Sequence, residues 1–113
     1  MELLSAAPRP LLVPALVVTE VSYLLADRIG AHGEVAFCRS IAEAELLVEP
    51  VLDSEWARIA ELTEQYVDLP LGVVDASVVV LAERHRCEVI ATFDHRHFSV
   101  VRPLHVPVLE LVP

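Results

Sequence analysis

Apolar and polar positions follow two different patterns along this chain, and the change of pattern marks the predicted elements. Some segments repeat apolar residues every three to four positions, which is typical of amphipathic helices, and short apolar runs beside prolines or polar residues are typical of strands. The predicted helices are 14–29, 31–47, 53–67 and 75–86, and the predicted strands are 11–13, 46–51, 88–93 and 106–112. Strands that alternate with helices predict an α/β fold with a parallel sheet and right-handed crossovers.

Three carboxylates occupy places where this pattern calls for apolar side chains. Glu20 lies on an apolar helix face, so we expect it to point toward the core or its rim, and Asp75 begins the apolar stripe of its helix. Asp94 closes the strand 88–93 at its carboxyl end, where ligands bind in open α/β sheets. Thr92, two residues earlier on the same side of that strand, is placed to add a hydroxyl. Converging carboxylates predict a site for a divalent cation.

Each of these acids also has an explanation that needs no ligand. Asp75 is a favoured residue type for a helix N-cap, and Asp94 suits a turn or a cap. A buried arginine that pairs with Glu20 would explain this acid without a ligand. Any one of these explanations is plausible alone, but three acids at strand ends or on apolar faces favour a shared site.

The composition limits the classes of function. Seventeen acids against eight bases, all of them arginine, give a net charge of −9, which excludes binding of nucleic acid through a basic surface and anticipates a basic partner. A hydrophobic fraction of 55% over 113 residues is enough for one domain, residues 1–113. The apolar runs are far shorter than the roughly 20 residues of a membrane span. The N-terminus opens with an acid and has no long apolar segment, so no secretory signal and a cytoplasmic location are predicted.

Three polar residues, His95, Arg96 and His97, directly follow Asp94. They fit a surface turn, and they also fit a phosphate contact made by Arg96 or His95. A zinc site is not predicted here, because no further cysteine or histidine lies at a suitable spacing.

The order of three motifs, T-E-V on one helix, V-V-D-A at the start of another and T-F-D-x-x-x-F after a strand, resembles the PIN-domain family. Within that family the chain is similar to the VapC toxins of bacterial toxin–antitoxin pairs, from Leu11 onward. The resemblance implies a three-layer α/β/α fold. It matches Glu20, Asp75 and Asp94 to three of the family's four acidic positions, and Thr92 to a polar residue near the last of them.

The function implied by this resemblance is hydrolysis of phosphodiester bonds in single-stranded or structured RNA by an endoribonuclease that uses Mg²⁺ or Mn²⁺. A cognate antitoxin protein and a homodimer are the implied partners, with no membrane. The alternative is a non-catalytic PIN-like remnant that keeps the antitoxin-binding or dimer surface. An aspartyl-phosphate phosphatase is disfavoured, because the chain has no D-x-D sequence.

One departure from the family concerns the N-terminus. PIN domains open with a strand that ends in an aspartate, and nothing before Leu11 matches it; Glu2 has no strand pattern around it. The segment MELLSAAPRP instead resembles the end of the family's first helix and the following loop. We therefore expect an N-terminally truncated domain whose sheet lacks its central strand, which would need a partner strand, a swapped dimer or an upstream segment. Cleavage activity is expected to be much reduced.

Overall fold

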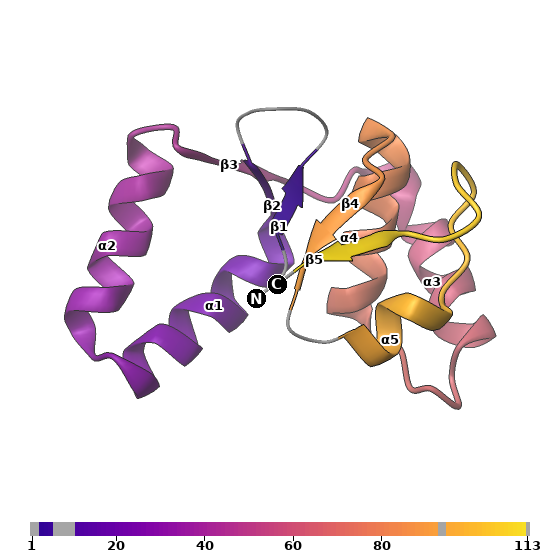
Figure 1. Cartoon of the computed structure of the whole chain (residues 1–113), viewed down its shortest axis with the longest axis horizontal. Helices are drawn as coiled ribbons and strands as arrows, with labels where there is room; N and C mark the ends of the chain where they lie inside the picture. Colours follow the sequence, from indigo (N-terminus) through magenta and orange to yellow (C-terminus); the bar gives the residue numbers. More distant parts are fainter. Residues whose placement is uncertain (1–2, 6–10, 93–94, 113) are drawn as a thin grey trace.

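A mixed β-sheet runs through the part of the chain that the computed structural model describes, which is residues 3–5, 11–92 and 95–112, with side chains for 11–92 and 96–112 (Figure 1). The strands are β1 (Leu3–Ser5), β2 (Leu11–Pro14), β3 (Leu46–Glu49), β4 (Val89–Ala91) and β5 (Glu110–Val112). The helices are α1 (Ala15–Arg28), α2 (Ala31–Ala42), the 3₁₀ turn η1 (Asp53–Glu55), α3 (Trp56–Gln65), α4 (Val73–His85) and α5 (His95–Val100).

The strand order in this sheet is β3-β2-β1-β4-β5. β2 pairs with β3 and β4 with β5 in parallel, whereas β1 is antiparallel to both of its neighbours. β2 to β5 therefore all run in one direction, as predicted, and β1 opposes them. The expectation of an empty sheet centre needs correction, because Leu4 pairs with both Leu12 and Ile90 there. β1 fills the backbone gap, but Leu3–Ser5 holds no acidic residue.

The α1–α2 hairpin extends from β2 and β3 on one side of the molecule, while α3, α4 and α5 gather around β4 and β5 on the other (Figure 1). α1 follows β2 without a linker, in agreement with the predicted helix 14–29. α2 ends at Ala42, earlier than predicted. Ala44 adopts a left-handed conformation with φ 60°, and the Glu45 N–H then closes on the Ser40 carbonyl at 2.9 Å. A helix closed in this way cannot continue.

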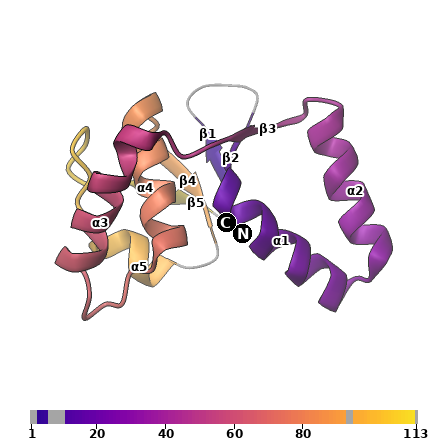
Figure 2. The same cartoon turned by 180° about the vertical axis from the view of Figure 1, so that it is seen from behind.

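The central helix of the fold is α4, in which residues 76–82 are all buried. The helix lies behind β4 in Figure 1 and in front of it in the reverse view of Figure 2, and it also contacts α3, α1 and β2. A helix that is apolar on all sides is stable only when it is covered on all sides. α4 ends where Arg86 turns left-handed (φ 55°) and the Cys87 N–H reaches the Ala82 carbonyl at 2.8 Å.

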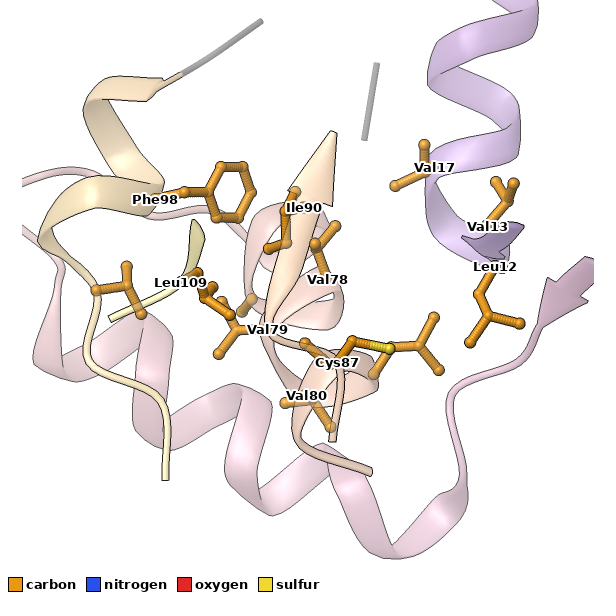
Figure 3. Close-up of a cluster of buried hydrophobic side chains, with 14 of the residues drawn as sticks. Leu12, Val13, Val17, Val78, Val79, Val80, Cys87, Ile90, Phe98 and Leu109 are labelled. Carbon is orange, nitrogen blue, oxygen red and sulfur yellow. The ribbon is translucent and has the colours of Figure 1, made fainter. Parts of the chain in front are cut away.

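This turn reverses the chain directly into β4, so α4 and β4 are antiparallel neighbours. The first residues of α4 therefore lie at the end of the sheet where β4 finishes. One continuous core joins the two elements to their surroundings, as Figure 3 shows for Val17 of α1, Val78 of α4 and Ile90 of β4. None of the helices in the described ranges combines the length and apolar character that crossing a bilayer requires.

Candidate active site

Asp75 lies in the first turn of α4, at the carboxyl end of β4. The N-cap of this helix is Gly72 and no side chain caps it, so Asp75 is the third helical residue, and the prediction of an N-cap role is wrong. Its side chain is 18% exposed. The free N–H groups and the dipole at a helix N-terminus stabilise a negative charge at this position. The fold therefore holds a largely covered carboxylate where a ligand would be expected.

The side chain of Asp75 is within hydrogen-bonding distance of His97. The Nδ1 atom of His97 lies 3.2 Å from Asp75 Oδ2, and the His97 side chain is 15% exposed. The predicted surface turn is wrong here, because His97 belongs to α5, which packs its fully buried Phe98 into the core (Figure 3). The sequence signal that could have indicated this helix is the i, i+3 spacing of the buried residues Phe98 and Val101.

Thr92 and Asp94 continue the chain from the carboxyl end of β4. Thr92 is 2% exposed, and its N–H donates to the Val112 carbonyl at 2.8 Å, which extends the pairing of β4 with β5 by one residue. Asp94 lies outside the described residues, so its predicted roles as a ligand or as a turn residue both stay predictions. The side chain of His95 is likewise not described.

Glu20 is exposed on α1, contrary to the expectation that it would point toward the core or its rim. The buried residues of α1 are Val17 and Val21, and Tyr23, three positions after Glu20, is 64% exposed. Within the described part of the chain Glu20 has no ion pair, so no buried arginine explains it. α1 does contact α4, and Val17 packs into the same cluster as Val78. Glu20 is thus a solvent-exposed residue of a helix that contacts the helix carrying Asp75.

No group of three His, Cys, Asp or Glu side chains among residues 3–5, 11–92 and 95–112 is placed to hold one metal ion. Asp75 has the hard oxygen donors that Mg²⁺ and Mn²⁺ prefer, and its Oδ1 has no hydrogen-bond partner within the described part of the chain. Its chemistry therefore fits one ligand of such an ion. A complete set would require further donors, of which Asp94 and Glu20 are the predicted ones.

The opposite end of α4 carries a set of ion pairs. Arg58 of α3 donates to both oxygens of Glu83, at 3.1 and 2.8 Å, and this hydrogen bonding raises the pKa of the Arg58 guanidinium. Arg84 donates to Glu55 at 2.9 Å and to the Pro50 carbonyl at 2.6 Å. These contacts join α4 to α3 and to the segment after β3, so their role is to hold the fold together.

Comparison with known proteins connects this arrangement to a family. The PIN domain profile matches residues 1–103 of the chain. Over 103 residues the chain is 36% identical to Ribonuclease VapC26 of Mycobacterium tuberculosis, an alignment that covers 91% of this chain and 76% of that protein. The α/β fold, with its helices around a largely parallel sheet, agrees with these matches. The chain therefore belongs to the PIN-domain family, and within it to the VapC type.

Proposed function

We propose that this protein is a metal-dependent endoribonuclease that hydrolyses phosphodiester bonds of single-stranded RNA. The observation that carries the proposal is the Asp75 carboxylate, which is largely covered, lies at the carboxyl end of β4 and keeps one oxygen without a hydrogen bond from the described residues. A relative named as a ribonuclease, 36% identical to this chain, supports the same reaction.

The residues that would hold Mg²⁺ or Mn²⁺ are Asp75, Asp94 and Glu20, with Thr92 directly after β4. When bound, such an ion would offset the charge of these carboxylates, lower the pKa of a bound water so that hydroxide is available to attack phosphorus, and stabilise the negative charge on the departing oxygen. Asp75 contributes a carboxylate whose charge the first turn of α4 stabilises. Arg96, exposed on α5 beside His97, is available to contact a phosphate of the RNA.

The partners follow from the same proposal. A cognate antitoxin would neutralise the protein, and the net charge of −9 supports a basic partner whose arginine reaches the acidic site. The protein would act in the cytoplasm and as a homodimer. A missing central strand no longer argues for the dimer, because β1 fills that place.

The test is cleavage of a single-stranded RNA by the purified chain, with Mg²⁺ or Mn²⁺ and with a chelator. Glu20→Gln and Asp94→Asn keep the size of each side chain and remove its charge, and both are expected to reduce cleavage. Glu64→Gln is the matched control, because Glu64 is an exposed acid on α3, a helix that carries none of the proposed ligands. Cleavage that survives the chelator, or that falls equally in the control, would contradict the proposal.

A second candidate is favoured by the absence of an acid in the described strand at the sheet centre, β1. This candidate is a non-catalytic PIN-like module that binds an antitoxin or a second copy. Titration with Mn²⁺ separates the two: binding that Asp75→Ala abolishes supports the nuclease, and no binding supports the module.

A further inference from the structure

We propose that His97 is a positioning residue for Asp75: its imidazole donates a hydrogen bond from Nδ1 to Oδ2 and so fixes the direction in which the other carboxylate oxygen, Oδ1, faces the site. This inference rests on the proposed function, in which Asp75 is a metal ligand. The two side chains come from α5 and α4, which are 22 positions apart in sequence, and their contact is 3.2 Å long.

The direction of this hydrogen bond follows from the chemistry of the groups on either side of the ring. An ionised carboxylate only accepts hydrogen bonds, so Nδ1 of His97 must carry the proton that it shares with Asp75. Arg96 Nη2 lies 3.4 Å from Nε2, and a guanidinium only donates. Nε2 is therefore the acceptor in that contact. Both contacts are satisfied together when a ring proton lies on Nδ1 and Nε2 carries none.

Packing gives the bond a defined geometry. Phe98, the next residue of α5, is fully buried against Ile90 and the α4 core (Figure 3), so α5 cannot rotate without exposing an aromatic ring. The side chains of His97 and Asp75 are only 15% and 18% exposed, so water competes weakly for their hydrogen bond. Asp75 itself is limited to the rotamers that the first turn of α4 allows. Together these constraints leave Oδ1 as the oxygen available to a ligand.

Removal of such a supporting hydrogen bond typically weakens metal binding by about 10- to 100-fold. We therefore expect His97→Leu to lose about 10-fold or more in Mn²⁺ affinity, measured by calorimetry on the full chain. His97→Asn places an amide N–H near the position of Nδ1, so its affinity is expected to stay within about threefold of the original. Ser99→Ala, an exposed substitution on the same helix, is the matched control and is expected to bind as the unaltered chain does.

Cleavage kinetics give a second readout. If His97 acts through Asp75, His97→Leu lowers kcat while the KM for RNA stays the same, because no substrate contact is removed. A larger effect on KM than on kcat would assign His97 to RNA binding and overturn the inference. Should His97→Leu fail to fold by circular dichroism, His97→Asn and His97→Gln are compared, since only Asn presents its N–H at the Nδ1 position. Equal Mn²⁺ affinities for these two variants would also overturn it.

The tautomer can be observed directly and without metal. Nitrogen-15 NMR of the imidazole rings distinguishes Nδ1–H from Nε2–H, and the His97 signal among the five histidines is the one that His97→Asn removes. The expected result is Nδ1–H in the unaltered chain and a shift toward Nε2–H in Asp75→Ala. Nε2–H in the unaltered chain would overturn the inference.

The outcomes separate this inference from the function on which it rests. If the unaltered chain binds no Mn²⁺, the proposed function fails and the inference fails with it. If the unaltered chain binds Mn²⁺, Asp75→Ala abolishes the binding and His97→Leu leaves it unchanged, only the inference fails.

Discussion

The two ends of α4 each carry a carboxylate, and the two carboxylates differ in how many of their oxygens accept hydrogen bonds within the protein. Glu83, near the last turn, accepts two hydrogen bonds from Arg58 and one from the Leu104 N–H at 2.9 Å, so both of its oxygens are occupied within the protein. Asp75, in the first turn, accepts one from His97 and keeps Oδ1 without a partner among the described residues. A carboxylate with both oxygens hydrogen-bonded inside the protein stabilises the fold, and one left half-occupied is available to a ligand.

The largest expected effect comes from Asp75→Asn. Replacing the carboxylate by an amide of the same size removes the charge that a cation would bind, so RNA cleavage is expected to fall by about 100-fold or more, beyond the effect of losing a supporting residue. The free energy of unfolding should fall by no more than about 1 kcal/mol, because the amide oxygen can still accept the hydrogen bond from His97 and only the stabilisation of the charge by the first turn of α4 is lost. Initial rates and urea denaturation measure the two quantities, and a large loss of stability would break the contrast between the two ends.

The converse is expected of Glu83→Gln. Arg58 would keep its charge while losing its main partner, so the free energy of unfolding is expected to fall by about 2 kcal/mol. Because the pKa of Arg58 is raised in the folded protein, the stability gained from its charged form is fully present below the ordinary pKa of arginine and is lost only at higher pH. The loss of unfolding free energy caused by Glu83→Gln should therefore be the same throughout the neutral pH range.

The control for Glu83→Gln is the rate of cleavage per folded molecule, which we expect to match that of the unaltered chain. Glu61→Gln provides a second comparison, because Glu61 also pairs with Arg58 but has a side chain that is 65% exposed. Glu61→Gln should therefore destabilise the protein less than Glu83→Gln, because an exposed ion pair contributes less than a covered one. The opposite order would contradict this explanation.

A pH effect is expected from Cys87, which follows the end of α4. Burial raises the pKa of the Cys87 thiol above its ordinary value of 9.0, so the folded protein holds this proton more tightly than the unfolded chain does. The stability that comes from this tighter binding of the thiol proton is fully present below pH 9.0 and is lost as the pH rises through the pKa of Cys87 in the folded protein. Denaturation curves collected on both sides of this pH measure the decrease. Cys38→Ser, at the exposed cysteine, should leave the decrease unchanged.

The smallest expected effect is a gain in stability. Arg86 holds a left-handed conformation with φ 55°, in which a side chain is strained and glycine is not. Arg86→Gly is therefore expected to raise the free energy of unfolding by about 0.5 kcal/mol, since relief of strain is partly offset by the greater flexibility of the unfolded chain. Thermal unfolding measures the gain, and RNA cleavage should not change. A lower unfolding temperature would show that the Arg86 side chain makes a stabilising contribution of its own.

Much of the fold was predictable because long segments carry a clear apolar period. The residues 75–86 and 88–93 were assigned as helix and strand, and the order of these two elements was enough to place Asp75 near the carboxyl end of β4. β1 was missed because three residues show no period, and its pairing depends on segments far away in the sequence.

The site was less predictable than the fold, because it depends on side-chain directions. Glu20 was expected near the core since leucines and valines surround it in sequence, yet Val17 and Val21 alone form the buried stripe. His97 was assigned to a turn because α5 is only six residues long, too short for a helical pattern to be recognised with certainty. The contact with Asp75 exists only after α5 has folded back on α4.

The position of β1 also has a consequence for the order in which the protein folds. In the described sheet β1 is the one strand that joins the β2–β3 pair to the β4–β5 pair, through Leu4 opposite Leu12 and Ile90. The partners within each pair are joined by a chain segment of moderate length, but the pairing of Leu4 in β1 with Ile90 in β4 closes a loop over residues 5–89 and therefore loses the most entropy. Topologies dominated by such distant pairings fold slowly. The sheet is thus expected to assemble as two halves, with insertion of the N-terminal strand as the slow step that unites them.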